Sequence, residues 1–411
     1  MIFILVLLAT QGTPLEDAAP NKEGDRFGRA LLSLHDMDKD GIPEIAVGAP
    51  TASSPDQYSG HVLILSGANR EILQTWRGEP RRSGFGETLR AAGDSNGDGT
   101  QDVLVGYETG DRTEVLSGVD GSILLSFDRT DEEVSPFGDL DQDGADDFLL
   151  AGEQLEVRSG RDGSFLGGHC WTDKGSAFQS VGDMDMDGLT DGVLLSDEPM
   201  LLLTAAPREG QRWSSFSNKT RKGLKELYAA IFKGREAQLI RCAPSGDLDG
   251  DGSQEFTAQV RVAETLELWA LSINPPKAWK LGSGKGDKKS TPHTGYGFGY
   301  KCFAVGDLDH DGLCDVIIAH AINPFHVTLQ AVTGKAGTQL WKSKLFDGGG
   351  TSGAAFALIH DPNDDGTPEI LLGTADWFWH GTVYRSGLLR SLSGETGEPL
   401  WELGVDKIRE R

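Results

Sequence analysis

The sequence has few cysteines, little positive charge and no long apolar run. Four cysteines in 411 residues exclude a small disulfide-stabilised scaffold, which would need many more. The 38 Lys and Arg stand against 63 Asp and Glu, for a net charge of −25, and this acidity argues against nucleic-acid binding. The apolar run from Ile2 to Ala9 is shorter than the roughly 20 residues of a membrane-spanning helix, so no transmembrane span is predicted.

Familiar catalytic motifs are absent as well. The sequence contains no Gly-x-Ser-x-Gly elbow, no phosphate-cradling loop and no His-Glu-x-x-His pair, and its nine histidines are scattered. We therefore predict no catalytic residues and no enzyme activity.

One acidic loop is present in seven copies. The first, Asp36 to Glu44, has oxygen-bearing side chains at positions 1, 3, 5 and 9 and glycine at position 6. The others begin at Asp94, Asp139, Asp183, Asp247, Asp307 and Asp361. Oxygens at alternate positions can converge on a cation that takes about six to eight oxygen ligands, and a backbone carbonyl at position 7 can complete the set. We predict up to seven calcium ions.

The predicted metal ligands are the residues at positions 1, 3, 5, 7 and 9 of each loop. In chain order they are Asp36, Asp38, Asp40, Ile42, Glu44; Asp94, Asn96, Asp98, Thr100, Asp102; Asp139, Asp141, Asp143, Ala145, Asp147; Asp183, Asp185, Asp187, Leu189, Asp191; Asp247, Asp249, Asp251, Ser253, Glu255; Asp307, Asp309, Asp311, Leu313, Asp315; and Asp361, Asn363, Asp365, Thr367, Glu369. Position 12 is always apolar where an EF-hand requires Glu, and a short aliphatic run follows. Each loop is therefore predicted to join two strands, not two helices.

The N-terminus and the cysteines bear on localisation. Residues 1–20 are predicted to be a truncated secretory signal without its basic leader, with an N-terminal strand as the alternative. A secreted, periplasmic or cell-surface protein is expected, because millimolar calcium outside cells can fill weak sites. Cys242 and Cys302 each lie five residues before a loop, where other repeats carry apolar residues, so both are predicted to be buried. For Cys170 and Cys314 a disulfide is left open.

The repeats predict an all-β fold of four-stranded units. One strand precedes each loop, a second follows it, a third ends in a glycine turn, and a fourth usually carries an aromatic residue that packs between units. Radially repeated units of this size form β-propellers. We predict a single seven-bladed propeller over residues 21–411, with antiparallel blades starting near residues 27, 85, 132, 175, 237, 298 and 353. The last repeat holds four strands of its own, so it needs no strand from the N-terminus.

Three stretches resemble a known family. Phe27-Gly28, the loop from Asp36 to Glu44 and Val47-Gly48-Ala49-Pro50 resemble the FG-GAP repeat of integrin α-subunit propellers and bacterial FG-GAP/VCBS relatives, and Phe85-Gly86 and Phe298-Gly299 repeat the first part. The resemblance implies a seven-bladed propeller with calcium between the first and second strands of a blade. Integrins fill only some blades, whereas all seven loops here keep their ligands. No inserted adhesion domain or leg region is present, so integrin-like signalling is not implied.

The face opposite the predicted calcium loops carries connections of variable length, and such loops on a rigid scaffold usually carry recognition. Aromatic and polar side chains in blades six and seven could stack a sugar ring or anchor a protein. These candidate ligand-binding residues are Phe325, His326, Trp377, Trp379 and His380. The alternative is that they only cover the blade edges. A basic insertion, residues 218–235, is predicted to contain a short amphipathic helix.

The sequence as a whole predicts a monomeric extracellular propeller that binds a protein or a glycan as an adhesion module, with calcium in a structural role. One alternative is a calcium-dependent enzyme, lyase-like or phospholipase-like, that acts on a polysaccharide or phosphoester at the variable face. Another is a purely structural repeat protein.

Overall fold

A computed structural model describes residues 25–404 of the chain, with gaps. The gaps are residues 55–56, 80–81, 83, 130–133, 152–153, 171–176, 185, 187–188, 196–199, 203–236, 274–275, 286–296, 324–325, 345–354, 363–364, 375–377, 380–381 and 384–386. The predicted N-terminal segment and the predicted helix of residues 218–235 therefore lie outside the described residues, as does Trp213, the aromatic residue expected in the outer strand of the fourth repeat.

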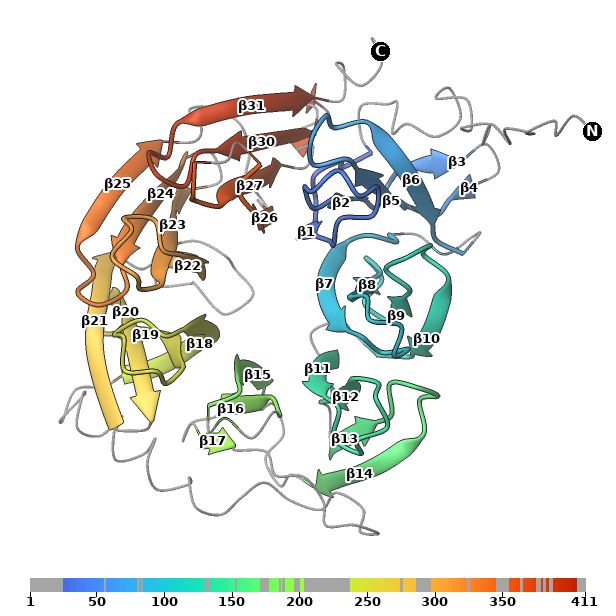
Figure 1. Cartoon of the computed structure of the whole chain (residues 1–411), viewed down its shortest axis with the longest axis horizontal. Coiled ribbons are helices and arrows are strands. Elements are labelled where there is room, and N and C mark those ends of the chain that lie inside the picture. Colours follow the sequence, from blue (N-terminus) through green and yellow to red (C-terminus); the bar gives the residue numbers. More distant parts are fainter. Residues whose placement is uncertain are drawn as a thin grey trace, which may run out of the picture.

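The described chain is all-β, and its sheets are arranged around a central axis (Figure 1). Six sheets have four antiparallel strands each, connected to their neighbours in chain order. They are β1 (Leu31–Ser33), β2 (Ile45–Ala49), β5 (His61–Leu65) and β6 (Ile72–Arg77); β7 (Thr88–Gly93), β8 (Asp102–Gly106), β9 (Thr113–Leu116) and β10 (Ile123–Phe127); β11 (Val134–Gly138), β12 (Asp147–Leu150), β13 (Gln154–Arg158) and β14 (Phe165–Cys170); β18 (Ala237–Gly246), β19 (Glu255–Val262), β20 (Thr265–Ile273) and β21 (Pro276–Lys285); β22 (Gly297–Gly306), β23 (Asp315–Asn323), β24 (His326–Thr333) and β25 (Gln339–Lys344); and β26 (Ala355–Ile359), β27 (Glu369–Thr374), β30 (Leu388–Leu392) and β31 (Pro399–Gly404).

The described residues thus form a β-propeller with six four-stranded blades, where seven were predicted. We number them one, two, three, five, six and seven after the repeats that form them. The fourth repeat forms a three-stranded sheet of β15 (Ala177–Gly182), β16 (Asp191–Leu195) and β17 (Met200–Leu202). Its predicted outer strand falls in residues 203–236, outside the described part of the chain.

Glycines at the FG and GAP positions allow the backbones of neighbouring blades to come into direct contact. A Cβ built on Gly48 would lie 2.1 Å from the carbonyl oxygen of Gly86 in the next blade, and one on Gly373 would lie 2.3 Å from that of Gly28. Phe27 and Phe85, which precede the FG glycines, are fully buried. The motif therefore joins one blade to the next, and the same contact joins blade seven to blade one.

Aromatic residues of the outer strands also pack between blades, as predicted. Trp279 Nε1 donates a hydrogen bond to the carbonyl oxygen of Gly334, and Trp341 Nε1 donates to that of Gly394, each at 2.7 Å and each across a blade boundary. The indole of Trp76 fills the space that a Cβ on Gly121 would occupy. Phe165 is the exception, with 40% of its side chain exposed.

The ring closes without an exchanged strand. Blade seven contains four strands of its own, which confirms the prediction. Phe27 and Leu31 of blade one share a core with Ile359, Leu371 and Leu389 of blade seven.

The cysteines behave as apolar residues. Both Cys242 and Cys302 are free thiols packed in hydrophobic clusters. Cys242 is buried as predicted, whereas Cys302 is only partly buried. Cys314 is also free, and the side chain of Cys170 lies outside the described residues. No helix in the described part of the chain is long and apolar enough to cross a bilayer.

Candidate calcium loops and the opposite face

The acidic loops share one hydrogen-bonding scheme that folds each loop around its own carboxylates. In loop one, Asp36 Oδ1 accepts the backbone N–H of Asp40, and its Oδ2 accepts that of Gly41. Asp38 accepts the N–H of Asp40, and Asp40 accepts that of Ile42. The same four bonds recur in loops two, three and six. Positions 1, 3 and 5 therefore shape the loop as well as offering oxygens.

Two loop positions adopt left-handed backbone conformations. Position 6 is glycine, with φ of 93° at Gly41 and 89° at Gly144, as the turn requires. Position 4 has positive φ too, including non-glycine residues such as Lys39, Gln142 and His310. The sequence offered a signal for position 4 only where glycine occupies it in loops two and five.

The acidic residue at position 9 is buried beneath the loop. In loops one to six its carboxylate accepts the N–H of position 2, as in the bond from Ser95 N to Asp102 Oδ2. Where position 9 is Asp, the second oxygen can also accept the N–H of the hairpin glycine after the third strand, as Gly118, Gly160 and Gly334 show. This carboxylate thus ties the loop to the third strand.

Burial raises the pKa of position 9 carboxyls above the usual value for Asp and Glu. It raises the pKa of Asp147 and of Glu369 to about 7, and that of Asp315 to about 6. Neighbouring loop carboxylates raise these pKa values further. A cation in the loop would counter both effects, because it stabilises the ionised form.

Several carboxylate clusters among the described residues could hold a metal ion. In loops one, five and six, oxygens of positions 1, 3 and 5 lie within 4.8 Å of one another, and in loop three the set is Asp139, Asp141 and Asp147. The structure therefore brings together ligands predicted in these four loops. Residues 185, 187–188, 363 and 364 of loops four and seven lie outside the described residues.

The donor set fits a hard divalent cation. All the clustered atoms are carboxylate oxygens, which Ca²⁺ prefers. Glu44 and Glu369 are at most 1% exposed, yet Glu44 Oε1 and both carboxylate oxygens of Glu369 have no hydrogen-bond partner. Buried carboxylate oxygens without a partner are unfavourable, and an ion in the loop would supply one.

The opposite face is built from the connections between second and third strands and between blades. Blades one and seven each add a two-stranded hairpin there, β3 (Ser53–Ser54) with β4 (Gln57–Tyr58), and β28 (Phe378–Trp379) with β29 (Thr382–Val383). Of the predicted ligand-binding residues, His326 and Trp379 are placed only by backbone, in β24 and β28. Phe325, Trp377 and His380 lie outside the described residues.

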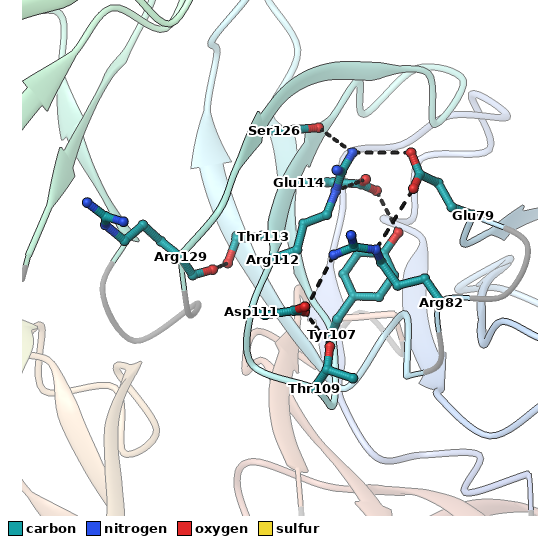
Figure 2. A network of polar contacts seen from close by, with 10 residues as sticks. All are labelled: Glu79, Arg82, Tyr107, Thr109, Asp111, Arg112, Thr113, Glu114, Ser126 and Arg129. Carbon is teal, nitrogen blue, oxygen red and sulfur yellow. Dashed lines mark hydrogen bonds and ion pairs between the residues drawn. The ribbon is translucent and has the colours of Figure 1, made fainter.

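An ion-pair network on this face joins blades one and two (Figure 2). Arg112 Nε donates to the buried Glu114 at 2.8 Å, and Tyr107 Oη donates to the other oxygen of Glu114 at 3.0 Å. Glu79, from the connection between the blades, pairs with Arg112 at 3.2 Å, and Arg82 lies over the Tyr107 ring. No residue pattern in the sequence indicated this network, which links the connection between blades one and two to strand β9.

Comparison with known proteins places these features in a family. Residues 27–65 match the FG-GAP repeat family. Integrin alpha-5 from Xenopus laevis is 34% identical over 105 residues, which are 24% of this chain and 10% of the integrin. The FG-GAP match and the similarity to the integrin support an FG-GAP, integrin-like β-propeller.

Other similarities extend further along the chain. Mouse phosphatidylinositol-glycan-specific phospholipase D is 24% identical over 348 residues, covering 79% of this chain and 40% of that enzyme. The chain therefore spans less than half the length of the curated relatives it matches. Among solved structures, the Vibrio cholerae biofilm matrix protein Bap1 is similar with a TM-score of 0.41 and 13% identity, over 91% of this chain and 79% of that one.

Proposed function

We propose that this FG-GAP chain is an extracellular, calcium-stabilised propeller that binds a protein or glycan partner through its variable face. The observation that carries the calcium part is that each buried position 9 glutamate has at least one carboxylate oxygen without a hydrogen-bond partner: Glu44 Oε1, Glu255 Oε1 and both oxygens of Glu369. Positions 1, 3, 5 and 9, with the position 7 carbonyl, would hold the ion. Bound calcium supplies positive charge that neutralises the clustered carboxylates.

Structural calcium follows from where the loops lie. Each loop joins the first and second strands of its blade, and its position 9 residue begins or directly precedes the second strand. Binding an ion there links both strands, and the binding free energy adds to folding stability. We extend the proposal to a seventh blade, in which the sheet β15–β17 gains its outer strand.

Two structural features of the variable face support a role in binding a partner. The two added hairpins belong to blades seven and one, which adjoin each other at ring closure. The ion-pair network stiffens the adjoining boundary between blades one and two. A rigid scaffold that presents irregular loops is typical of a binding module, and the integrin relatives are consistent with an adhesive role.

Calcium removal tests the structural role. Thermal unfolding of the full chain in excess chelator is expected to show a melting temperature lower by several degrees than in calcium. The double substitution Asp38→Asn and Asp40→Asn should reduce the difference. A control with Glu71→Gln and Glu395→Gln, exposed residues in hairpins on the same face, should retain it. An unchanged melting curve in excess chelator would overturn the proposal.

Binding of glycans or candidate protein partners tests the recognition role. On a glycan array or an immobilised extracellular matrix, Trp377→Ala with Trp379→Ala is expected to weaken binding at least about tenfold, as loss of an aromatic anchor does. Phe165→Ala, an exposed aromatic on the outer strand β14, should leave binding unchanged. Equal binding by both variants would exclude these tryptophans as the site.

A second candidate function is phosphoester hydrolysis. The similarity to phosphatidylinositol-glycan-specific phospholipase D over 79% of this chain favours it. Against it, the possible metal clusters among the described residues consist of carboxylates alone, all within the FG-GAP loops. Calcium-dependent turnover of phosphodiesters or polyuronates by the purified chain would establish this function.

A further inference from the structure

The hairpin that follows the third strand is different in blade five. In five other blades the hairpin begins with a glycine packed on the carbonyl oxygen of loop position 8. A Cβ there would lie about 2 Å from that oxygen, for example 1.8 Å from Asp146 O at Gly160 and 2.1 Å from Cys314 O at Gly334. Blade five has Ile273 at this place, directly after Ser272. Its side chain excludes the same close packing.

The blade five hairpin carries a lysine into the acidic loop. Ile273 pairs with Pro276, and the next residue, Lys277, places Nζ 2.8 Å from Asp249 Oδ2 and 2.6 Å from Asp251 Oδ2. These are positions 3 and 5 of loop five, and with Asp247 they form one of the clusters whose oxygens lie within 4.8 Å of one another. The ammonium therefore contacts two of the three clustered carboxylates.

Loop five also departs from the shared hydrogen-bonding scheme. Asp247 Oδ1 accepts the N–H of Gly250 at position 4, whereas the corresponding oxygen in loops one, two, three and six accepts that of position 5. The bond to the position 6 glycine is retained, from Gly252 to Asp247 Oδ2. The turn is thus altered in the loop that carries the lysine.

We propose that Lys277 is a tethered cation that competes with calcium for loop five. The inference rests on the proposed calcium function of the other loops. The ammonium neutralises part of the carboxylate charge, so loop five is held without metal. A calcium ion would have to displace the ammonium or bind beside it, and either is unfavourable at these distances. Loop five then stays free of calcium at concentrations that fill loops one, three and six.

Arg161 in blade three shows that a nearby cation does not always block a loop. Its Nε lies 2.9 Å from Asp143 Oδ2, and its Nη2 donates to the Asp143 carbonyl oxygen at 2.6 Å. The cluster of Asp139, Asp141 and Asp147 excludes Asp143 and is left intact. Arg161 thus contacts the edge of loop three, whereas Lys277 contacts two members of the cluster in loop five.

Hydrogen exchange of the full-length protein with and without calcium tests the inference. In the wild type, loops one, three and six are expected to lose protection in chelator, while residues 247–255 exchange equally in both conditions. In Lys277→Met, residues 247–255 should become calcium-dependent, and one more calcium should bind by equilibrium dialysis. Half-maximal protection of this loop in Lys277→Met should occur at a calcium concentration at least about tenfold below any at which the wild-type loop responds. Lys280→Met is the matched control, since Lys280 lies on the same strand and pairs with Glu267 at 2.8 Å, away from the loop.

The outcomes separate the two proposals. If residues 247–255 of the wild type respond to calcium as loops one, three and six do, the role of Lys277 is overturned while calcium binding stands. If Lys280→Met also bound one more calcium, the role of Lys277 would be overturned, because the additional binding would then result from the loss of any positive charge. If no loop responds and no calcium is bound, the proposed calcium function itself fails.

Discussion

Gly160 illustrates how a single missing Cβ sets the distance between a hairpin and a loop. A Cβ there would lie 1.8 Å from the carbonyl oxygen of Asp146, closer than any non-bonded contact allows. Gly160→Ala should therefore push the hairpin away, break the bond from Gly160 N to Asp147, and destabilise the protein by about 3 kcal/mol. Urea unfolding measures the change. Gly404→Ala, where no atom lies within 4 Å of the built Cβ, is the control and should change stability by less than about 1 kcal/mol.

His61 should make the protein sensitive to acid. It is 3% exposed, and neither ring nitrogen has a hydrogen-bond partner. Burial, with the charge of Arg77, lowers its pKa to about 4. The unfolded chain takes up this proton near pH 6.5, so stability is present above that pH and is lost as pH falls toward 4. His61→Leu should therefore lose about 3 kcal/mol less unfolding free energy than the wild type between pH 7.5 and pH 4. Urea unfolding of both proteins at these two pH values, in saturating calcium, gives the difference in unfolding free energy between wild type and variant. A difference that stays constant with pH would contradict the prediction.

From the sequence, the role of a loop position could be predicted where that role requires a particular residue type. Glycine at position 6 adopts positive φ, and the acidic residues at positions 1, 3 and 5 cluster in loops one, five and six. The sequence did not reveal positions 4 and 8. Position 4 tolerates residues as different as Lys39 and His310 in the left-handed region, and position 8 contributes a backbone carbonyl to the hairpin contact. A contact made by a backbone group places little constraint on the residue type, so the sequence does not reveal it.

At the scale of elements, the outer-strand aromatics hold adjacent blades together. Trp341 is 8% exposed, and its Nε1 donates to Gly394 O of the next blade at 2.7 Å. Trp341→Ala should destabilise the protein by about 3–5 kcal/mol, because it removes a large buried side chain and leaves a carbonyl unpaired. Phe165, the aromatic residue of the outer strand of blade three, is 40% exposed, so Phe165→Ala should cost less than half as much. Denaturant unfolding of the two variants makes the comparison, and equal losses would refute it.

Strand positions were predictable because alternating apolar runs and glycine turns recur with each loop. The differences between blades were not. Phe165 and Trp341 are both aromatic residues of an outer strand, yet Phe165 pairs with Arg158 whereas Trp341 pairs with Ala331, one register position further from the hairpin. In the sequence, Lys277 likewise cannot be distinguished from an ordinary surface lysine. Only the geometry of the hairpin places it beside Asp249. Such contacts arise between segments, and spacing along one chain does not encode them.

At the scale of the whole molecule, the acidic loops form a connected series. A Cβ on Gly97 of loop two would lie 2.9 Å from the carbonyl oxygen of Gly144 in loop three, and one on Gly366 of loop seven would lie 3.4 Å from His310 in loop six. Asp94 N donates to Asp146 Oδ2 at 2.9 Å, and Asp146 N donates to the Asp94 carbonyl oxygen at 2.9 Å. Ordering one loop therefore favours the order of the next.

Ring closure should be the weakest boundary in the propeller. Phe27 and Phe85 are both fully buried at the same motif position, but a covalent connection crosses only the boundary at Phe85. At the closure of blade one on blade seven, the described contacts are side-chain packing, close glycine approaches and the stacking of Arg70 over the Trp401 ring. Each Phe→Ala substitution removes about 3–5 kcal/mol of packing. Since no chain tethers blades seven and one, Phe27→Ala should also open the ring.

Calorimetry and limited proteolysis can compare the two variants at equal calcium concentration. Phe27→Ala is expected to lower the melting temperature more than Phe85→Ala does, to broaden the transition, and to raise the rate of cleavage. Phe85→Ala should keep a single sharp transition, because the tethered blades re-form their contact at high effective concentration. Identical melting and cleavage of the two variants would show that closure is as strong as the internal boundaries.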